Sequence, residues 1–346
     1  MKDQKKPATV IGLGDLVLSL APTGFTRFLQ AEEFGAFYTG AEANVCAALS
    51  CFDIPTRYLT RVPKNEIGQA AINNLRRYGI DTSFVARGGD RIGVLYLEKG
   101  ASQRPSKVIY DRFHSGFCEA TVEDFDLNAA LEGAGWLHFS GITPALSDGT
   151  EELTRQILKL AKQKGITVSC DLNYRKNLWT SEKANKVMSE LLPYVDVLIA
   201  NEEDAAKVLG IHARDTDVDA GKINAIGYID VAKQIHDRFG IQTVATTLRE
   251  SISASRNIWS AMMWRNGEAY FSEKYDIQIV NRVGGGDSFS AGLIYALVSE
   301  LEPQKAVEFA AAASCLKHTV ENDFNLVTVD EVTALANGDK SGRVKR

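Results

Sequence analysis

Ile166-Thr167-Val168-Ser169-Cys170-Asp171 is a short, largely apolar stretch that ends on a carboxylate. Amphipathic helical patterns lie on both sides of it, from Glu151 to Lys164 and around Glu182–Leu192. Two further apolar stretches, Trp136–Ser140 and Val195–Ala200, come next in each direction. Short apolar strands that alternate with amphipathic helices are typical of a parallel sheet covered on both faces. Since the connections between such strands are right-handed, the pattern predicts an α/β fold with a doubly wound, mostly parallel sheet.

The same alternation extends toward both ends of the chain. Further helices are predicted at Glu42 to Phe52, Ile67 to Tyr78, Val231–Phe239, Asp287–Leu301, Pro303–His318 and Asp330–Ala336. A strand is predicted at Gln242–Thr247. A hairpin of Ser260–Trp264 and Ala269–Ser272 is also predicted, because Asn266-Gly267 between them is a strong turn signal.

The first third of the chain also contains strand patterns that no helix separates. Phe34–Thr39, Gly93–Glu98 and Lys107–Arg112 are predicted to form a small antiparallel sheet at one edge, as a lid over a site. We therefore interpret residues 1–346 as a single domain in which β-lid segments near 16–40 and 90–115 are inserted in the α/β core.

The composition is that of an ordinary globular protein and excludes several classes of function. The chain has 346 residues and a formal net charge of −5, which favours neither nucleic acid nor an anionic membrane as a partner. It contains no run of about 18 apolar residues, so no membrane-spanning helix is expected. Its five cysteines are scattered, which indicates free thiols in a reducing cytoplasm. The first apolar stretch is too short for a signal peptide, so a cytoplasmic location is expected.

Three consecutive glycines precede the helix predicted at Asp287. Glycines let backbone N–H groups approach an anion closely, and a helix N-terminus supplies unpaired donors and the positive end of a dipole. Asp287 in the first turn is placed to accept the proton of an attacking hydroxyl, while the N–H groups of Gly284, Gly285 and Gly286 hold phosphoryl oxygens. In the alternative interpretation the glycines form a flexible loop and Asp287 interacts only with the helix dipole.

Two other phosphate-binding motifs are excluded. The sequence has no G-x-x-x-x-G-K-[ST] motif, so it is not a P-loop enzyme. Gly12-Leu13-Gly14 begins like a dinucleotide fingerprint, but Val17 stands where the third glycine belongs and Asp15 would bring a negative charge to a pyrophosphate.

Five motifs in order along nearly the whole chain resemble those of the ribokinase-like (PfkB-type) carbohydrate kinases. They are Gly12–Asp15, Thr39–Leu49, Val62–Gly68, Asn201–Asp204 and Gly284–Asp287. Each motif is weak alone, but five in register are a strong signal. The resemblance implies the ribokinase-like fold, with a small β lid, and it implies ATP and Mg²⁺ as cofactors.

Within this family the likeness is greatest to the 2-keto-3-deoxygluconate kinases. It rests on Gly40–Asn44, Tyr110–Arg112, Ser140–Leu146, Asp171–Arg175 and Asp323–Asn325. The resemblance implies ATP-dependent phosphorylation of the 6-hydroxyl of 2-keto-3-deoxygluconate to 2-keto-3-deoxy-6-phosphogluconate. Asp287 would be the general base of this reaction.

The arginines support an acidic substrate. Arg112 and Arg175 each follow a tyrosine, one in the predicted lid and one after a parallel strand, and a guanidinium there can hold a carboxylate with two hydrogen bonds. A surface ion pair is the alternative for either arginine. The substrate-binding residues that the resemblance implies are Gly40, Asn44, Tyr96, Tyr110, Arg112, Arg175 and Asp323. Tyr96 could instead pack in its strand, and Gly40 could simply form a strand-to-helix turn.

The nucleotide side is also carried over from the family. The ATP-binding residues are Asn173, Tyr174, Arg175, Thr247, Leu248, Arg249, Glu250, Ser251 and Ile252. Asn201 and Asp204 would order Mg²⁺ through water, although Asn201 could be only a helix N-cap.

The sequence departs from the family pattern at three places. Neither glycine of the family's Thr-Leu-Gly-x-x-Gly nucleotide loop is present in Thr247–Ser253. Thr39 stands in place of the first glycine of Gly-Gly-Ala, and Glu321-Asn322 precedes Asp323 where Pro-Gly is common. None of these changes removes a catalytic group.

Three functions therefore stay open. The first is a kinase of 2-keto-3-deoxygluconate, which binds this sugar acid and ATP. The second is a kinase of the same fold that acts on another sugar, such as fructose or ribose. The third is a non-catalytic sugar-acid sensor, which the missing glycines suggest. A homo-oligomer is expected because family members often assemble through lid or sheet contacts.

Overall fold

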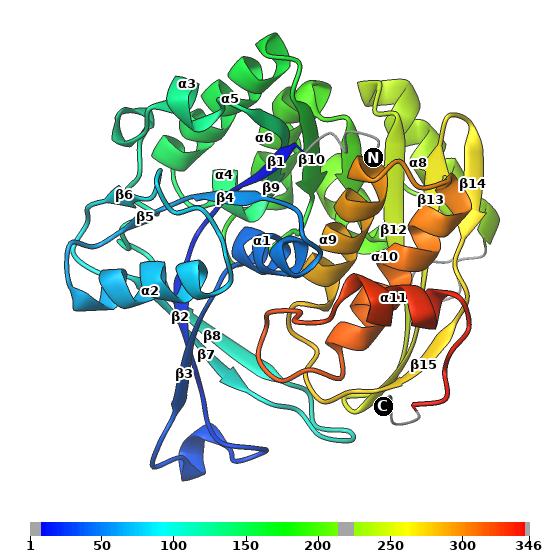
Figure 1. The fold of residues 1–346 in the computed structure, drawn as a ribbon, viewed down its shortest axis with the longest axis horizontal. Helices are drawn as coiled ribbons and strands as arrows, with labels where there is room; N and C mark the ends of the chain where they lie inside the picture. The colour runs from blue at the N-terminus through cyan, green and yellow to red at the C-terminus, as the bar shows by residue number, and fades with distance from the viewer. Residues whose placement is uncertain (1–7, 214–224, 343–346) are drawn as a thin grey trace, which may run out of the picture.

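The computed structural model describes residues 8–213 and 225–342. Its main sheet has nine strands, in the order β14-β13-β12-β11-β10-β9-β1-β4, with β15 paired to β13 (Figure 1). The strands are β1 Thr9–Leu13, β4 Thr56–Leu59, β9 Ala134–Ser140, β10 Thr167–Asp171, β11 Val197–Ile199, β12 Thr243–Ser253, β13 Arg256–Arg265, β14 Glu268–Phe271 and β15 Tyr275–Gln278. All pairings from β4 to β12 are parallel, and those of β13 are antiparallel.

Helices cover both faces of this sheet, which confirms the predicted doubly wound α/β fold (Figure 1). The helices are α1 Ala41–Cys51, α2 Glu66–Arg77, α3 Leu127–Ala130, α4 Ile142–Ala145, α5 Asp148–Gln163, α6 Ser181–Leu191, α7 Glu202–Asp204, α8 Ala225–Phe239, α9 Gly285–Val298, α10 Pro303–Lys317 and α11 Val329–Ala336.

The alternation of side chains along each strand divides the core in two. In β11, Leu198 packs in the cluster that contains residues of α5, α6 and α8, whereas Val197 and Ile199 pack in the cluster that contains residues of α1, α9, α10 and α11. Successive side chains of a strand point to opposite faces, so a continuous apolar stretch is what a sheet covered on both sides requires.

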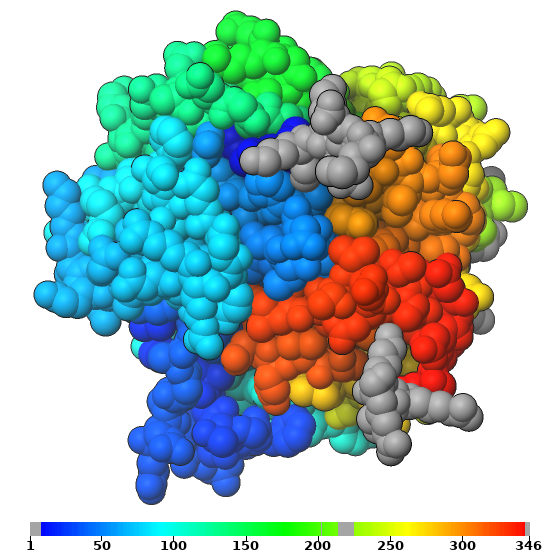
Figure 2. All heavy atoms as spheres, in the orientation of Figure 1, coloured from blue at the N-terminus to red at the C-terminus, as the bar shows by residue number. Residues whose placement is uncertain are grey.

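A second, four-stranded sheet has the order β3-β2-β7-β8, from β2 Val17–Ala21, β3 Gly35–Thr39, β7 Gly93–Glu98 and β8 Lys107–Asp111. The predicted sheet was wholly antiparallel, but the central pair β2–β7 is parallel and joins two antiparallel hairpins. The strand pattern of β2 was not recognised, and both hairpins begin with a strand that runs in the same direction. This small sheet projects from the main body (Figures 1 and 2).

The backbone enters and leaves the small sheet at residues that line one cavity, among them Asp15, Gly40 and Arg112. Gly14–Leu16 connect β1 to β2, Gly40 connects β3 to α1, and Arg112 directly follows β8. A third, two-stranded sheet pairs β5 Arg61–Val62 with β6 Ala86–Arg87.

The turn at Asn266-Gly267 is confirmed as the β13–β14 hairpin. Both residues have positive φ, 53° and 90°, which a two-residue hairpin turn of this type requires. The strand predicted at Gln242–Thr247 is longer than expected. It continues as β12 to Ser253 and pairs with β13, so Thr247–Ile252 is not a loop. With no glycine to interrupt it, this segment extends the ladder.

In the part of the chain that the structure describes, no helix is long and apolar enough to span a membrane. The five cysteines are free, and Cys46, Cys118 and Cys170 are buried.

Candidate active site

A cavity of about 640 Å³ lies at the carboxyl ends of the parallel strands, beside the small sheet. Its walls come from the ends of β10 and β11, from the N-terminus of α9 and from the inner face of the small sheet. The carboxyl ends of the strands are where ligands bind in open α/β sheets. Most of the predicted site residues line this single cavity.

The three predicted anion-hole glycines form the start of α9. Gly284 has a φ of 82°, and a Cβ there would lie 2.2 Å from the carbonyl oxygen of Asp323, so only glycine fits. Gly285 begins the helix, and a Cβ on Gly286 would meet nothing within 4 Å. The first-turn N–H groups and the positive end of the α9 dipole therefore border open space that suits an anion.

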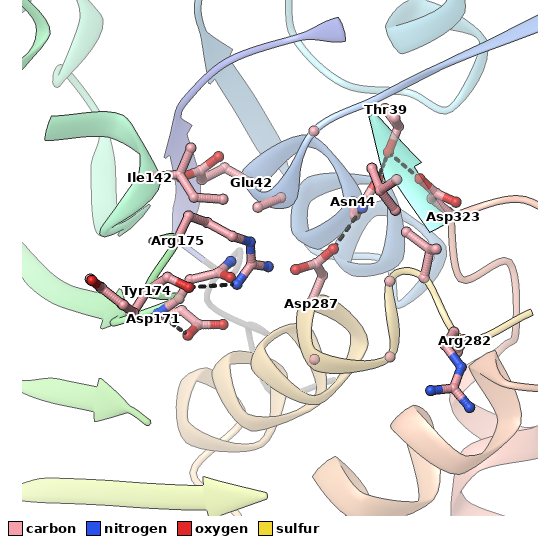
Figure 3. Close-up of a pocket in the computed structure, with 18 of the residues that line it drawn as sticks. Thr39, Glu42, Asn44, Ile142, Asp171, Tyr174, Arg175, Arg282, Asp287 and Asp323 are labelled. Atoms are coloured by element: carbon pink, nitrogen blue, oxygen red, sulfur yellow. Dashed lines mark hydrogen bonds between the residues drawn. The ribbon is translucent and has the colours of Figure 1, made fainter. Parts of the chain in front are cut away.

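Asp287 lies in the first turn of α9, and its Oδ2 accepts a hydrogen bond of 2.6 Å from Nδ2 of Asn44 (Figure 3). The pKa of Asp287 is raised to about 7, mainly by burial and also by the neighbouring Glu42 and Asp323 carboxyls, although the hydrogen bond from Asn44 and the charge of Arg175 oppose the rise. A carboxylate with this proton affinity is suited to accept a proton near neutral pH.

Asn44 and Asp323, both predicted to bind substrate, meet at Thr39. The hydroxyl of Thr39 lies 2.9 Å from Oδ1 of Asn44 and 2.7 Å from Oδ2 of Asp323 (Figure 3). Burial raises the pKa of Asp323 to about 6, and its Oδ1 has no hydrogen-bond partner among the described residues. These three residues come from β3, α1 and the segment after α10, so the fold alone brings them together.

Asp15 and Arg112 form the wall of the cavity at the small sheet. The guanidinium of Arg112 lies 3.9 Å from Oδ2 of Asp15 and stacks on the ring of Tyr110 at 4.4 Å. Both residues are buried, and neither the carboxylate oxygens of Asp15 nor Nε of Arg112 has a hydrogen-bond partner among the described residues. Burial raises the pKa of Asp15 to about 6.

Asp15 was not among the predicted site residues. Its position directly after the first strand, in Gly12-x-Gly14-Asp15, was a usable signal. Gly40 lines the cavity, and a Cβ there would lie 2.1 Å from the carbonyl oxygen of Asp15, so the glycine also admits the protein's own backbone.

Arg175 lies on the opposite side of the cavity from Thr39 and Asp323, close to Asp171 and Asp287 (Figure 3). Its Nη1 donates to the carbonyl oxygen of Tyr174 at 3.0 Å, and it opposes the raised pKa values of three carboxyls, those of Asp171, Asp204 and Asp287. Arg112 and Arg175 therefore share one cavity but have different neighbours.

Asp204 and Asn201 also line the cavity. Oδ1 of Asn201 accepts from the backbone N–H of Asp204 at 2.8 Å, so Asn201 does act as a helix N-cap. Burial raises the pKa of Asp204 to about 6, and burial with the nearby Asp204 and Asp287 carboxyls raises that of Asp171 well above its usual range.

Within residues 8–213 and 225–342 no three His, Cys, Asp or Glu side chains form a metal-binding group. Because Mg²⁺ retains much of its water, a carboxylate and an amide oxygen among repelling carboxylates fit this ion.

The alternation of side chains along β12 determines which residues of the predicted nucleotide-binding segment face the cavity. Thr247, Arg249 and Ser251 line the cavity, but Leu248, Glu250 and Ile252 do not. Glu250 pairs instead with Lys274, at 2.6 Å between Oε1 and Nζ, and Ile252 is exposed. The prediction that all six residues bind ATP therefore has no support from the cavity for these three, because the segment is a strand and not a loop.

Tyr96 also faces away from the cavity. Its neighbour Leu95 lines the cavity, whereas the ring of Tyr96 packs edge-on against Phe34 at 6.3 Å. This is the alternative in which Tyr96 packs in its strand, and its position does not support substrate contact.

Two basic residues near the glycine turn were missed. Arg282 lines the cavity beside Arg249, donates to the carbonyl oxygen of Ala254 at 3.0 Å, and has a buried Nε without a partner among the described residues (Figure 3). Lys317 of α10 is fully buried behind Gly284, and burial lowers its pKa to about 8. Arg282 precedes the glycines by two residues, which was a signal. The place of Lys317 depends on how α10 packs.

A glycine-rich helix N-terminus and a buried carboxylate that face one cavity suit phosphoryl transfer from a nucleotide. The class of this protein is that of the kinases. A model of the family described as "pfkB family carbohydrate kinase" matches residues 13–326, and the chain belongs to this family.

Three of the similar proteins have names that specify a 2-dehydro-3-deoxy sugar acid as substrate. The crystal structure of 2-dehydro-3-deoxygluconokinase from Thermotoga maritima has a TM-score of 0.92 and 49% identity, with 96% of this chain and 98% of that chain covered. The 2-dehydro-3-deoxygalactonokinase of Haloferax volcanii is 30% identical over 97% of this chain and 98% of its own. The 2-dehydro-3-deoxygluconokinase of Thermoproteus tenax is 25% identical over 92% of each.

Proposed function

We propose that this protein transfers the γ-phosphoryl group of ATP to the 6-hydroxyl of 2-keto-3-deoxygluconate, which is also called 2-dehydro-3-deoxygluconate. The observation that carries the proposal is that one cavity contains both Asp287, at the N-terminus of α9, and the buried guanidinium of Arg112. The first supports phosphoryl transfer, and the second supports a substrate with a carboxylate.

In the proposed reaction the 6-hydroxyl oxygen attacks the γ-phosphorus in line with the leaving group. The bond from the γ-phosphorus to the β–γ bridging oxygen breaks, and ADP leaves with that electron pair. The hydroxyl proton passes to the carboxylate of Asp287. The N–H groups of Gly284, Gly285 and Gly286 stabilise the negative charge on the transferred group. Mg²⁺, when bound through water at Asn201 and Asp204, would neutralise phosphate charge.

The other residues divide between the two substrates. Arg112 would hold the carboxylate of the sugar acid, with Tyr110 beside it, and Asp15 and Asp323 would accept hydrogen bonds from its hydroxyls. Their carboxylate oxygens without partners support this assignment. Arg249 and Arg282 would bind ATP phosphates, and they offset the missing glycines of the family's nucleotide loop. Arg175 would neutralise charge where the two substrates meet.

The single-domain interpretation, with the small sheet as a lid, belongs to the same proposal. The small sheet would close over the cavity when the sugar acid binds, which would exclude water from the phosphoryl group. The support is its position beside the cavity and the exposed side chains of β8.

A second substrate is favoured by the relative from Haloferax volcanii, whose name specifies the galactonate epimer. The two sugar acids differ in configuration at C4. A coupled assay of ADP release tests both substrates side by side with gluconate, fructose and ribose. The proposal expects a keto-deoxy sugar acid to be preferred. Preference for fructose or ribose would reject the carboxylate clamp, and binding of a sugar acid without ATP turnover would indicate a sensor.

A further inference from the structure

Thr39 has no role in the proposed reaction, although it lies at the wall of the same cavity. It ends β3 and is buried, with 2% of its surface exposed, between Asn44 and Asp323, which are 4% and 1% exposed. Nδ2 of Asn44 in turn donates to Asp287. Asp287, Asn44, Thr39 and Asp323 thus form a four-residue network that joins two carboxyl groups of the cavity (Figure 3).

The hydrogens of this network do not suffice for two ionised carboxylates. The hydroxyl of Thr39 has one hydrogen but lies within hydrogen-bond distance of two acceptor oxygens, those of Asn44 and Asp323. If Thr39 donates to Asn44, then Asp323 must carry a proton and donate it to Thr39. If Thr39 donates to Asp323, the side-chain amide of Asn44 must be flipped in order to bond both of its neighbours. Its NH₂ group then donates to the hydroxyl oxygen of Thr39, and its Oδ1 accepts from a protonated Asp287.

The network therefore has two fully bonded states, and each contains one proton on a carboxyl. In the first state Asp323 is protonated and Asp287 is an ionised acceptor. In the second state Asp287 is protonated and Asp323 is ionised. The first state is the one that a general base needs before the reaction, and the second is the one that follows proton uptake.

We propose that Thr39 is a positioning residue, whose hydroxyl couples Asp323 to Asp287 through Asn44 and holds Asp287 ready to accept a proton. The inference rests on the proposed role of Asp287 as general base. Glycine, which the family motif has at this position, offers no hydroxyl, so the coupling is specific to chains that have threonine or serine here.

Other charged groups also face the two carboxyls. Glu42 of α1, Asp171 at the end of β10, Arg175 beyond it and Lys317 of α10 act on Asp287. Lys317 and Lys99 act on Asp323. Burial raises both pKa values, that of Asp287 to about 7 and that of Asp323 to about 6, so both carboxyls change protonation state close to neutral pH. All these groups remain when the hydroxyl alone is removed.

The test compares Thr39→Val, which keeps the shape and removes the hydroxyl, with Thr39→Ser, which keeps the hydroxyl. Thr154→Val is the matched control, because Thr154 is a fully buried threonine of α5 whose hydroxyl donates only to the backbone of Thr150. The steady-state kcat, the KM for the sugar and the pH profile of kcat/KM are measured with whichever sugar the unaltered protein phosphorylates.

We expect Thr39→Val to lower kcat by about tenfold, as for the loss of one buried hydrogen bond. It should also move the acid limb of kcat/KM to higher pH by about half a unit to one unit, because Asn44 then stabilises ionised Asp287 less well. Thr39→Ser and Thr154→Val should match the unaltered protein on both readouts.

An unchanged kcat and an unchanged acid limb in Thr39→Val would overturn the inference. Equal impairment of Thr39→Ser and Thr39→Val would also overturn it, because packing of the methyl group would then explain the loss. The dependence of melting temperature on pH between 5 and 8 gives a second test that needs no substrate. Thr39→Val should alter the shape of that curve, and an unaltered shape contradicts the coupling. Full turnover by Asp287→Asn would instead reject the proposed role of Asp287 as general base, so this failure is distinguishable from a failure of the Thr39 coupling.

Discussion

The two larger sheets of this protein differ most in burial. In the nine-stranded sheet Val10, Ile11 and Leu13 of β1 are fully buried, and helices cover both faces. In the four-stranded sheet every residue of β8 is exposed, and the buried apolar cluster consists of three residues, Val17, Leu95 and Leu97. Elements with few buried contacts open at low free-energy cost, whereas a core held from both sides does not.

This difference matches the chemistry that each region supplies. Asp287 and the glycine turn are attached to a helix packed in the main core, and phosphoryl transfer depends on fixed geometry. Tyr110 and Arg112 come from the small sheet and its boundary, where the proposed recognition of a carboxylate would affect binding more than the chemical step. We therefore expect substitutions in the first region to change kcat and those in the second to change KM.

The largest effect is expected from Asp287→Asn. The amide keeps the size of the side chain but cannot accept the hydroxyl proton, so kcat should fall by about 10²–10⁴-fold while the KM values change little. Steady-state kinetics with saturating ATP measure this. Turnover near that of the unaltered protein would remove Asp287 as the base and would erase the contrast between the regions.

Arg112→Leu tests the small-sheet side. Loss of a charge-assisted hydrogen bond should raise the KM for the sugar acid by about 10–100-fold, with a smaller change in kcat. Arg91→Leu is the control, since Arg91 pairs with Asp111 at the surface of the same sheet and does not line the cavity. An unchanged KM for the sugar acid in Arg112→Leu would contradict the assigned clamp.

Arg249→Ala and Glu250→Ala sharpen the comparison within one strand. Arg249 lines the cavity and Glu250 does not, although they are adjacent in β12. The first substitution should raise the KM for ATP by about fivefold to tenfold through loss of a phosphate contact, and the second should leave it unchanged. Equal effects of the two substitutions would mean that the strand twists or opens when ATP binds.

The smallest effect concerns stability. The pKa of Asp287 is raised from 3.8 to about 7 in the folded protein, so the folded state loses stability from this group as pH rises from about 4 to about 7. Asp287→Asn removes this cost and should raise the melting temperature by about 2–5 °C at pH 8. At pH 4 the difference should disappear. A variant that melts lower at pH 8 would show that the carboxylate stabilises the fold.

The architecture of the main sheet could be predicted because its apolar stretches are continuous and regularly spaced. The glycine turn could be predicted because left-handed backbone and close approach both select glycine. In contrast, the side chains that face the cavity from β7 and β12 depend on strand register. Leu95 rather than Tyr96, and Arg249 rather than Glu250, point inward because each strand pairs with a particular partner in a particular frame.

Thr39 and Lys317 could not be assigned from the sequence for a different reason. Thr39 acquires its task from Asp323, which is 284 residues away, and Lys317 acquires its place from the packing of α10 behind Gly284. Such roles depend on contacts between distant segments, and no local pattern of residue types encodes them.

The crossings between the two sheets have a mechanical consequence. Asp15, Thr39 and Arg112 all lie at or next to the points where the backbone enters or leaves the small sheet. A rotation of the small sheet must bend the backbone at these points, so its axis runs close to them, and atoms near an axis travel least. If the small sheet moves as the proposed lid, its outer strands would therefore be displaced more than Asp15, Thr39 and Arg112.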